Sequence, residues 1–545
     1  MKNFTLKLIL RGFCLLLLYA CNQAPKPVFN NNVISAAHPL ASLAGKAVYA
    51  QGGNAFDAAV AAAFSLSVVE SSMSGIGGRL QAIYRTSDGS IAGVDASTEV
   101  PINYTPLEQK YSYGYETIGI PGVVAGLIKL HEDHGVLELN AVLAPAIDYA
   151  ENGYKMLPGE ALRQQMAAER IAEFEGSSHH FLKENGAVNS TGDLIIQKDL
   201  AEVLKAIAAK GRKGFYEGEV ARKIVEDIQA NGGIITLQDL KNYRALSSKI
   251  VDGVFKDHKV HSLYLPSFGA ITIQILQILD HLPSFKSEED WALSNGKATE
   301  IAYEYRKKQG NSDSLNLILS YEKAGELADK IHSSYSNIQR NDNSENPISF
   351  GSIDGHTTHL TAVDHFGNAV SLTQTIGPNM GSKVATKGLG FLYAVTLGGY
   401  LGDYKPGDRA NSHISPTIIT KYGELILAIG AAGGSRIVPA ISQVVSRHID
   451  QKNTLERSLM LPRVYPFEDT LWIEDHDSVK DINAVLNATT FRTKMINSIA
   501  RFGRVHAVSF DSLNNSWKGA ADPDWEGTTE YYIADEKKIV LYFCG

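Results

Sequence analysis

Thr357 and Thr375 are the residues whose types and spacing could support covalent catalysis. A threonine hydroxyl is a poor nucleophile until a base removes its proton. An N-terminal threonine supplies that base from its own α-amine, whose ordinary pKa is about 7.7–8. If the hydroxyl of Thr357 attacked the carbonyl of His356 and water resolved the ester, an internal threonine would become such a residue. The chain is therefore expected to cleave itself between His356 and Thr357.

The residues around these threonines predict a β-hairpin. Residues 357–363 and 369–375 alternate in polarity, and residues 364–368 have a turn composition. Pairing centred on Phe366 sets Thr357 opposite Thr375, close enough for contact between the hydroxyls. Residues 340–356 have the Asn-, Gly- and Pro-containing polar composition of a flexible linker, which suits release of the new end. Thr375 is therefore expected to orient and polarise Thr357. His356 is a solvated linker residue in one interpretation and assists cleavage in the other.

A glycine pair further along the chain could complete the site. Gly433 and Gly434 follow strand-like residues 417–421 and 425–429, and a helix is expected to begin at about this turn. Because no side chain blocks approach, their backbone N–H groups could form an oxyanion hole. A tight turn without a catalytic role is the alternative.

The elements that must position these residues begin with two helices, over residues 40–50 and 55–69. Asn54 is the expected N-cap of the second helix, which is apolar on all faces and should be buried between layers. Residues 80–84 resemble a strand, and helical patterns dominate residues 122–308.

Composition excludes several classes of function. The chain has 545 residues, 44% of them apolar and 20% charged, with a formal charge of −8. This composition is typical of a globular protein, and an acidic surface without a basic run disfavours nucleic-acid binding. The sequence contains no phosphate loop, dinucleotide fingerprint or evident metal cluster, so neither a cofactor nor a metal is expected.

The N-terminus resembles a bacterial lipoprotein signal. Basic residues precede a short apolar stretch at 13–20, which ends before Cys21. Residues 1–20 would be removed, and the Cys21 thiol would carry the lipid of an exported periplasmic or cell-surface protein. A plain signal peptide is the alternative. Cys14 lies in the signal and only Cys544 remains, so no intrachain disulfide is expected.

Taken together, the motifs resemble the γ-glutamyltranspeptidase (glutathione hydrolase) family of N-terminal-nucleophile hydrolases over nearly the whole mature chain. The matching segments are GGNAFDAAVAAA at 52–63, SGIGG at 74–78, PGVVAG at 121–126, PSFG at 266–269, TTH at 357–359, GNAVS at 367–371, SPT at 415–417, GGSR at 433–436 and GAADP at 519–523. The resemblance implies an α/β (α+β) fold, a four-layer αββα sandwich. It also implies cleavage into a large segment, residues 21–356, and a small one, residues 357–545. The two segments would stay associated as one unit.

Several positions depart from the family pattern. Ser97 stands where the family has an arginine that binds the glutamyl α-carboxylate, and Gly377 replaces an asparagine. Thr396 and Gly399 replace residues of the ammonium-binding run, and the lid loop is almost absent. Of two paired serines Ser412 is kept, whereas the second is His413, which lines the pocket or simply packs. Arg79 replaces a glycine; it is either a relocated carboxylate anchor beside Ser97 or an exposed charge at a strand end. His359 is expected to be structural.

Loss of an arginine–carboxylate pair and an ammonium partner should weaken γ-glutamyl binding by several kcal/mol. The sequence therefore favours a self-processed threonine amidase that acts on another acyl group from a small-molecule or peptide amide, by hydrolysis or transfer. Relatives with such altered pockets include cephalosporin acylases, oxamate amidohydrolases and poly-γ-glutamate-depolymerising enzymes. The alternatives are a true γ-glutamyltransferase with a rebuilt pocket and an uncleaved, non-catalytic surface lipoprotein.

Overall fold

A computed structural model describes residues 28–106, 108–109, 111–335, 356–399, 403–475, 492–497 and 502–533. The predictions for the signal at 1–20, for Cys21, for linker residues 340–355 and for Cys544 lie outside these ranges.

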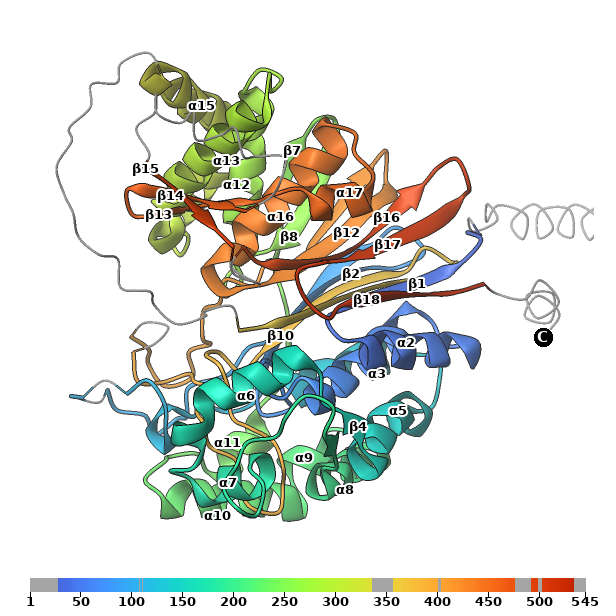
Figure 1. Cartoon of the computed structure of the whole chain (residues 1–545), viewed down its shortest axis with the longest axis vertical. Coiled ribbons are helices and arrows are strands. Elements are labelled where there is room, and N and C mark those ends of the chain that lie inside the picture. Colours follow the sequence, from blue (N-terminus) through green and yellow to red (C-terminus); the bar gives the residue numbers. More distant parts are fainter. Residues whose placement is uncertain are drawn as a thin grey trace, which may run out of the picture.

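Two stacked antiparallel sheets form the centre of the molecule (Figure 1). The seven-stranded sheet has the order β18 (Thr528–Tyr532), β1 (Asn32–Ala36), β9 (Thr358–Val363), β10 (Ala369–Thr375), β2 (Arg79–Arg85), β3 (Ile91–Ala96) and β6 (Leu246–Ser247). The six-stranded sheet has the order β17 (Ser516–Ala521), β16 (Arg504–Asp511), β12 (Glu424–Ala432), β11 (Thr417–Lys421), β8 (His258–Leu263) and β7 (Ile250–Phe255). An apolar layer that includes Val33, Ile83, Val363 and Trp517 fills the space between the sheets.

A helical layer covers the outer face of each sheet (Figure 1). The layer on the seven-stranded sheet comprises α2 (Pro39–Ala50), α3 (Ala55–Val69), α4 (Val123–His134), α5 (Leu139–Asn152), α6 (Pro158–Ile171), α7 (Glu175–Phe181), α8 (Lys198–Lys210), α9 (Lys213–Tyr216), α10 (Gly218–Ala230) and α11 (Leu237–Asn242). The other layer comprises α12 (Gly269–His281), α13 (Glu288–Tyr303), α14 (Ser312–Leu319), α15 (Tyr321–Tyr335), α16 (Ile437–Val445) and α17 (Leu455–Met460). The predicted αββα sandwich is confirmed.

Two small sheets lie outside this sandwich. They are formed by β4 (Tyr154–Lys155) with β5 (Leu194–Ile195), and by β13 (Val464–Phe467), β14 (Thr470–Glu474) and β15 (Arg492–Ile496).

Helix α3 illustrates how the sequence forms the helical layer that covers the seven-stranded sheet. The Asn54 side chain accepts hydrogen bonds from the backbone N–H groups of Phe56 and Asp57, and the Asp57 carboxylate accepts one from Asn54 N, which completes a capping box. All 15 residues of the helix are buried. Both the predicted bounds and the predicted burial are confirmed.

One hairpin was missed within the region that the sequence assigned to helices. β7 and β8 pair between Ile250 and Leu263, and their turn residues Lys256 and Asp257 have φ values of 45° and 59°. Such a turn usually contains glycine or asparagine, which are the residues that adopt positive φ most easily. The turn residues Lys256 and Asp257 therefore give little indication of a hairpin in the sequence. The strand structure of this segment is set by its pairing in the tertiary structure.

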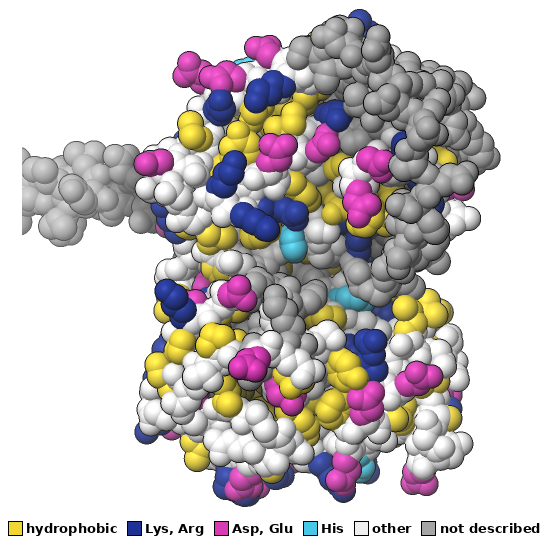
Figure 2. All heavy atoms as spheres, turned by 90° about the vertical axis from the view of Figure 1, so that its left-hand side faces the viewer, with side chains coloured by type: hydrophobic (Ala, Val, Ile, Leu, Met, Phe, Trp, Pro, Cys, Tyr) yellow, Lys and Arg dark blue, Asp and Glu magenta, His cyan; other side chains and the backbone are white. Residues whose placement is uncertain are grey.

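The catalytic threonine candidates lie at one end of the central strands β9 and β10. Figure 2 shows the face of the molecule toward this end, where lysine and arginine side chains lie on both sides of the waist between the two halves. Among the described residues, no helix combines the length and apolarity needed to cross a membrane.

Candidate active site

The predicted hairpin forms in the predicted register. Thr358 pairs with Gln374 and His359 with Thr373, so Thr357, just before β9, lies beside Thr375 at the end of β10. The Thr357 hydroxyl is 3.2 Å from the Thr375 hydroxyl, and both residues are buried. The two side chains that the sequence paired are therefore brought together.

The hydroxyl of Thr375 also contacts the peptide bond that precedes Thr357. Thr375 Oγ1 donates to the carbonyl oxygen of His356 at 3.0 Å and accepts from the backbone N–H of Gly377 at 3.0 Å. The Thr357 hydroxyl contacts the same carbonyl oxygen. A donor on a carbonyl oxygen favours the negative charge that develops there under nucleophilic attack. The arrangement thus places a nucleophile and a polarising group on one peptide bond.

A buried arginine that the sequence did not reveal holds the other side of Thr357. Arg504 Nη2 donates to the carbonyl oxygen of Thr357 at 2.9 Å, and its Nη1 lies 3.5 Å from Glu70 Oε1. Burial raises the pKa of Glu70, whereas the charges of Arg504 and Arg163 oppose that shift. The ring of Trp525 lies 5.0 Å from the Arg504 guanidinium. Nothing local in the sequence around Arg504 distinguishes it from any strand residue.

The glycine turn directly follows the residue that pairs with Arg504 in the six-stranded sheet. Ala432, the last residue of β12, pairs with Arg504, and the turn follows at once. Gly433 and Gly434 have φ values of 141° and 59°, and a Cβ atom on Gly433 would lie 2.7 Å from the Cα of Gly503. Only glycine suits such backbone angles in so tight a space. A short 3-10 turn, Gly434–Arg436, then leads into α16, close to the predicted helix start.

Arg79 is buried, so the interpretation as an exposed strand-end charge is wrong. It lies opposite Thr375 in the pairing of β2 with β10 and is 2% exposed. Its Nη2 donates to the carbonyl of Val395 at 3.2 Å, and its Nη1 lies 3.5 Å from Thr98 Oγ1. A Cβ atom at Gly377 would come within 3.1 Å of Nη2. The missing side chain at Gly377 therefore makes room for the guanidinium of Arg79.

Ser97 directly follows the neighbouring strand β3, next to this arginine. Leu80 pairs with Ala96, so the next step of the ladder brings Arg79 and Ser97 together. Ser97 is fully buried and its hydroxyl accepts from Gln81 Nε2 at 3.1 Å. Thr396 reaches the same region, since its hydroxyl donates to Thr98 Oγ1 at 2.8 Å. The hydroxyls of this region lie beside the Arg79 guanidinium and beside the buried carboxylate of Asp95, which accepts from the Ser97 N–H at 2.9 Å and pairs with Arg409 at 3.3 Å.

His413 is a neutral imidazole at the edge of the site. Arg306 Nη1 donates to its Nε2 at 3.2 Å, and the Phe268 ring packs against it at 4.9 Å. Burial lowers the pKa of His413 to about 3, and the charges of Arg306, Arg436 and Arg79 act in the same direction. Ser412, beside it, is partly exposed, and its N–H donates to the carbonyl of Pro266 at 2.8 Å.

His359 lies in the core of the sheet and is fully buried. Its Nδ1 is 2.7 Å from Thr373 Oγ1 and its Nε2 is 3.1 Å from Thr361 Oγ1. Burial lowers its pKa well below the ordinary value, so it is neutral. These contacts suit a structural histidine.

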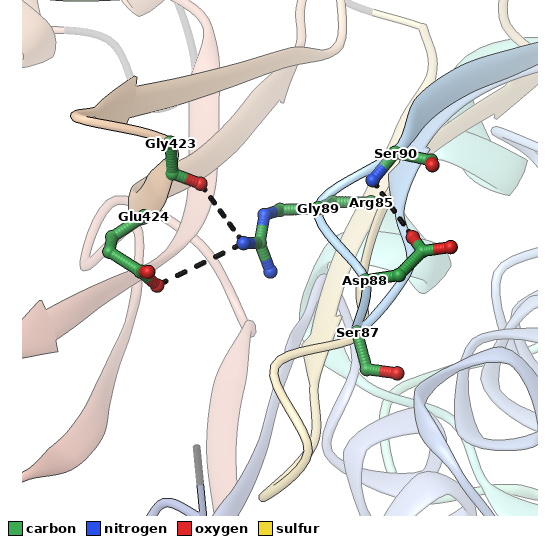
Figure 3. A pocket seen from close by; sticks show the side chains of 7 residues that line it. All are labelled: Arg85, Ser87, Asp88, Gly89, Ser90, Gly423 and Glu424. Atoms are coloured by element: carbon green, nitrogen blue, oxygen red, sulfur yellow. Dashed lines mark hydrogen bonds and ion pairs between the residues drawn. The ribbon is translucent and has the colours of Figure 1, made fainter. Parts of the chain in front are cut away.

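A separate cavity of about 500 Å³ lies at the opposite end of β2 from Arg79 (Figure 3). Arg85 projects into it and donates to the carbonyl of Gly423 at 3.0 Å, across the gap between two hairpins. Glu424 approaches the same guanidinium at 3.9 Å. None of the nucleophile candidates lines this cavity.

The αββα sandwich, with a threonine just before a central strand and a second hydroxyl and a glycine turn nearby, matches one class of protein. That class is the N-terminal-nucleophile hydrolases, in which an N-terminal threonine freed by self-cleavage can attack an amide.

Comparison with known proteins places the chain within this class. The sequence profile of the family described as "Gamma-glutamyltranspeptidase" matches residues 41–532. The chain belongs to the γ-glutamyltranspeptidase family and is an enzyme of its hydrolase and acyltransferase type. It is 31% identical over 502 residues to the capsule biosynthesis protein CapD proenzyme of Bacillus anthracis, covering 91% of this chain and 90% of the relative. It is 29% identical to the acylase ACY 1 proenzyme of Pseudomonas sp. (strain V22), covering 94% and 95%.

Solved structures agree on the fold. The crystal structure of cephalosporin acylase from Bacillus halodurans superposes with a TM-score of 0.82 at 24% identity, covering 93% of this chain and 97% of that one. At this identity the likeness concerns the fold alone.

Proposed function

We propose that the chain is the precursor of a threonine amidase, with Thr357 as the nucleophile. The observation that carries this proposal is the contact of the Thr357 and Thr375 hydroxyls with each other and with the His356 carbonyl. This carbonyl belongs to the one peptide bond whose cleavage would turn Thr357 into an N-terminal residue. In this proposal His356 and Thr357 flank the cleavage site.

Self-cleavage proceeds through an ester. The Thr357 oxygen attacks the His356 carbonyl carbon, and the Thr375 hydroxyl stabilises the oxyanion. The C–N bond breaks, the Thr357 nitrogen takes up the proton as a free amine, and the acyl group remains on the side-chain oxygen. Water then hydrolyses this ester and leaves a carboxylate on His356.

Turnover repeats the same chemistry on an external amide. The freed α-amine takes the proton of the Thr357 hydroxyl as it attacks the amide carbonyl. The N–H groups of Gly433 and Gly434 bind the oxyanion, and the leaving amine departs with the proton. Water releases the acyl group from Thr357, or an amine acceptor takes it.

Two segments, divided at residue 356, form one unit in this proposal. After cleavage, β9 and β10 of the small segment would still pair with β1 and β2 of the large one. Such shared sheets hold the cleaved pieces together without a covalent link, because the inter-strand hydrogen bonds and the core between them remain.

The test combines cleavage and acylation in one purified protein. Intact-mass measurement should show two fragments divided at residue 356, and a small amide library should yield an acyl adduct on the fragment that begins with Thr357. Thr357→Ala should stay full-length, whereas Thr357→Ser should still cleave. A full-length wild-type chain with no acyl adduct would refute the proposal.

A γ-glutamyltransferase with a rebuilt pocket is the second candidate, favoured by the guanidinium of Arg79 one strand from Thr375. Relatives such as the glutathione hydrolase proenzyme of Bacillus subtilis (strain 168), 28% identical over 559 residues, support testing it. Turnover of a γ-glutamyl anilide in clear preference to other acyl anilides would establish this candidate.

Export with a lipid on Cys21 completes the proposal. The basic start, the apolar stretch at 13–20 and Cys21 support it. Metabolic labelling with a radioactive fatty acid should mark the wild-type chain and leave Cys21→Ser unlabelled. Equal labelling of both would refute lipidation at this residue.

A further inference from the structure

Two histidines and an aspartate come together on the surface of the helical layer that covers the seven-stranded sheet. His179 and His180 lie in the last turn of α7, and Asp199 lies in the first turn of α8. One atom from each residue, a ring nitrogen or a carboxylate oxygen, lies within 4.8 Å of the other two. Imidazole nitrogens and carboxylate oxygens are ordinary zinc ligands. The three residues are therefore candidates to bind one metal ion.

The orientation of His180 is set by a residue outside this cluster. Its Nε2 lies 3.2 Å from the backbone carbonyl oxygen of Thr386. A carbonyl can only accept a hydrogen bond, so Nε2 carries the proton, and Nδ1 of the neutral ring keeps its lone pair. Nδ1 is the atom that faces Asp199. A histidine that binds a metal typically donates its other N–H to a carbonyl or a carboxylate, which fixes the ring in this same way.

The gap between His180 and Asp199 suits an ion better than a direct contact. His180 Nδ1 and Asp199 Oδ2 are 3.9 Å apart, which is too long for a hydrogen bond. Two ligands at the usual zinc distances of about 2.0–2.2 Å lie about 3.4 Å apart in a tetrahedral site. His179 is exposed and the side chain of Asp199 is 40% exposed, so both can rotate to close the remaining distance.

The set of donor atoms favours zinc among the divalent metals. Mg²⁺ and Ca²⁺ prefer oxygen ligands, whereas two imidazoles and one carboxylate suit Zn²⁺. Three protein ligands leave the fourth position to water, which can enter beside the exposed His179. Local sequence patterns do not reveal this set, because Asp199 joins the histidines only in the folded chain.

Helix α7 also holds a piece of the chain that follows β10. The Ser177 hydroxyl donates to the carbonyl of Lys383 at 2.6 Å and accepts from the N–H of Ala385 at 2.7 Å. A Cβ atom on Gly176 would clash with the Ala385 carbonyl oxygen, so the two backbones are in close contact. An ion shared by α7 and α8 would therefore brace a contact between the two segments that cleavage after residue 356 would separate.

We propose that His179, His180 and Asp199 bind one zinc ion, with a water molecule in the fourth position. The ion ties the end of α7 to the start of α8 and stabilises the contact of α7 with residues 383–386. None of the residues of the candidate active site supplies a ligand, so this inference does not depend on the proposed amidase function.

The experiment measures zinc binding to the purified full chain, made without a histidine tag and stripped of metal with a chelator. Isothermal titration with Zn²⁺ should show binding by the wild type, and the Tm should rise as zinc is added. His179→Gln and Asp199→Asn each remove one ligand. Loss of a group that only orients a ligand lowers metal affinity by about 10–100-fold, so loss of a ligand should lower it by at least about 10-fold. Because both side chains reach solvent, the metal-free variants should melt as the metal-free wild type does.

A matched control removes a histidine from another histidine–aspartate pair. His261 Nδ1 lies 2.6 Å from Asp252 Oδ1, and its Nε2 lies 2.9 Å from Thr420 Oγ1, so both ring nitrogens already have partners. His261→Gln should therefore bind zinc as the wild type does. Co²⁺ gives a second readout, because its visible absorption changes when protein ligands replace water. The change should appear in the wild type and in His261→Gln and be lost in His179→Gln.

Two results would overturn the inference. Equal zinc affinity in the wild type, His179→Gln and Asp199→Asn would show that the ion binds elsewhere on the chain. A wild-type chain whose Tm does not respond to zinc would show that no ion braces these helices.

Discussion

Replacing Thr375 by valine tests the central geometry of the site. Valine keeps the shape of the side chain but removes the hydroxyl that donates to the His356 carbonyl at 3.0 Å. Loss of one oxyanion donor lowers a reaction rate by about 10²–10³. We therefore expect Thr375→Val to cleave itself about 10²- to 10³-fold more slowly than the wild type.

The same substitution has a cost in stability that can be estimated separately. The Thr375 hydroxyl accepts from the buried N–H of Gly377 at 3.0 Å, and valine leaves that donor without its acceptor. An unsatisfied buried donor costs about 1–3 kcal/mol. Urea unfolding should compare the Thr357→Ala chain with a chain that carries both Thr357→Ala and Thr375→Val. Neither of these proteins cleaves itself, so the difference between their unfolding free energies measures this loss alone.

The assay follows freshly synthesised precursor on denaturing gels over time. Thr375→Ser retains the hydroxyl and serves as the control, with cleavage within about 10-fold of the wild type, since one donor is worth more than that. A folded Thr375→Val precursor that cleaves at the wild-type rate would refute the polarising role of this residue.

Three further predictions follow from other parts of the structure. Arg504→Met should destabilise the chain by about 3–5 kcal/mol in urea unfolding, because it leaves the buried Glu70 carboxylate without one of its cations; an unchanged midpoint would contradict the proposed support of Thr357. Gly433→Ala, at φ 141° and with a Cβ atom 2.7 Å from the Cα of Gly503, should displace the turn and its N–H groups and reduce amide turnover by about 10²-fold while cleavage at residue 356 continues, and full turnover would contradict an oxyanion role that depends on the position of this turn. Burial lowers the pKa values of His38 and His506 to about 3, so these side chains are neutral in the folded chain but take up protons in the unfolded one below about 6.5. Their stabilisation is thus complete above pH 6.5, and the free energy of unfolding should fall by about 1.4 kcal/mol per pH unit for each histidine as pH drops toward 5. His38→Asn, which can still cap α2, should lower the slope by about 1.4 kcal/mol per pH unit, the share of one histidine, and a flat pH profile would contradict the assignment.

Local sequence determined the elements that carry the proposed nucleophile. Alternation in residues 357–363 and 369–375 fixed the strands, and the turn length fixed the register that joins Thr357 to Thr375. The cap at Asn54 and the apolar run after it fixed α3. These features depend on neighbours in the chain, so the sequence alone sufficed. The motif series likewise sufficed to identify the family.

The hairpin β7–β8 shows where local reasoning failed. Its turn residues lack the usual glycine or asparagine, and its strands are decided by pairing with β11. A segment whose local preference is weak takes the structure that its tertiary partners impose.

Long-range contacts decided how the site is supported and charged. Arg504 reaches Thr357 over 147 positions of the chain, and Arg306 reaches His413 over 107. No spacing rule connects residues so far apart, because only the packing of the two sheets and the glycine turn brings them together. The sequence by itself thus predicted the candidate nucleophile and the hydroxyl that lies beside it, and it determined the fold. Only the tertiary structure showed that Arg79 is buried beside Gly377, and that Arg504 holds the carbonyl of Thr357.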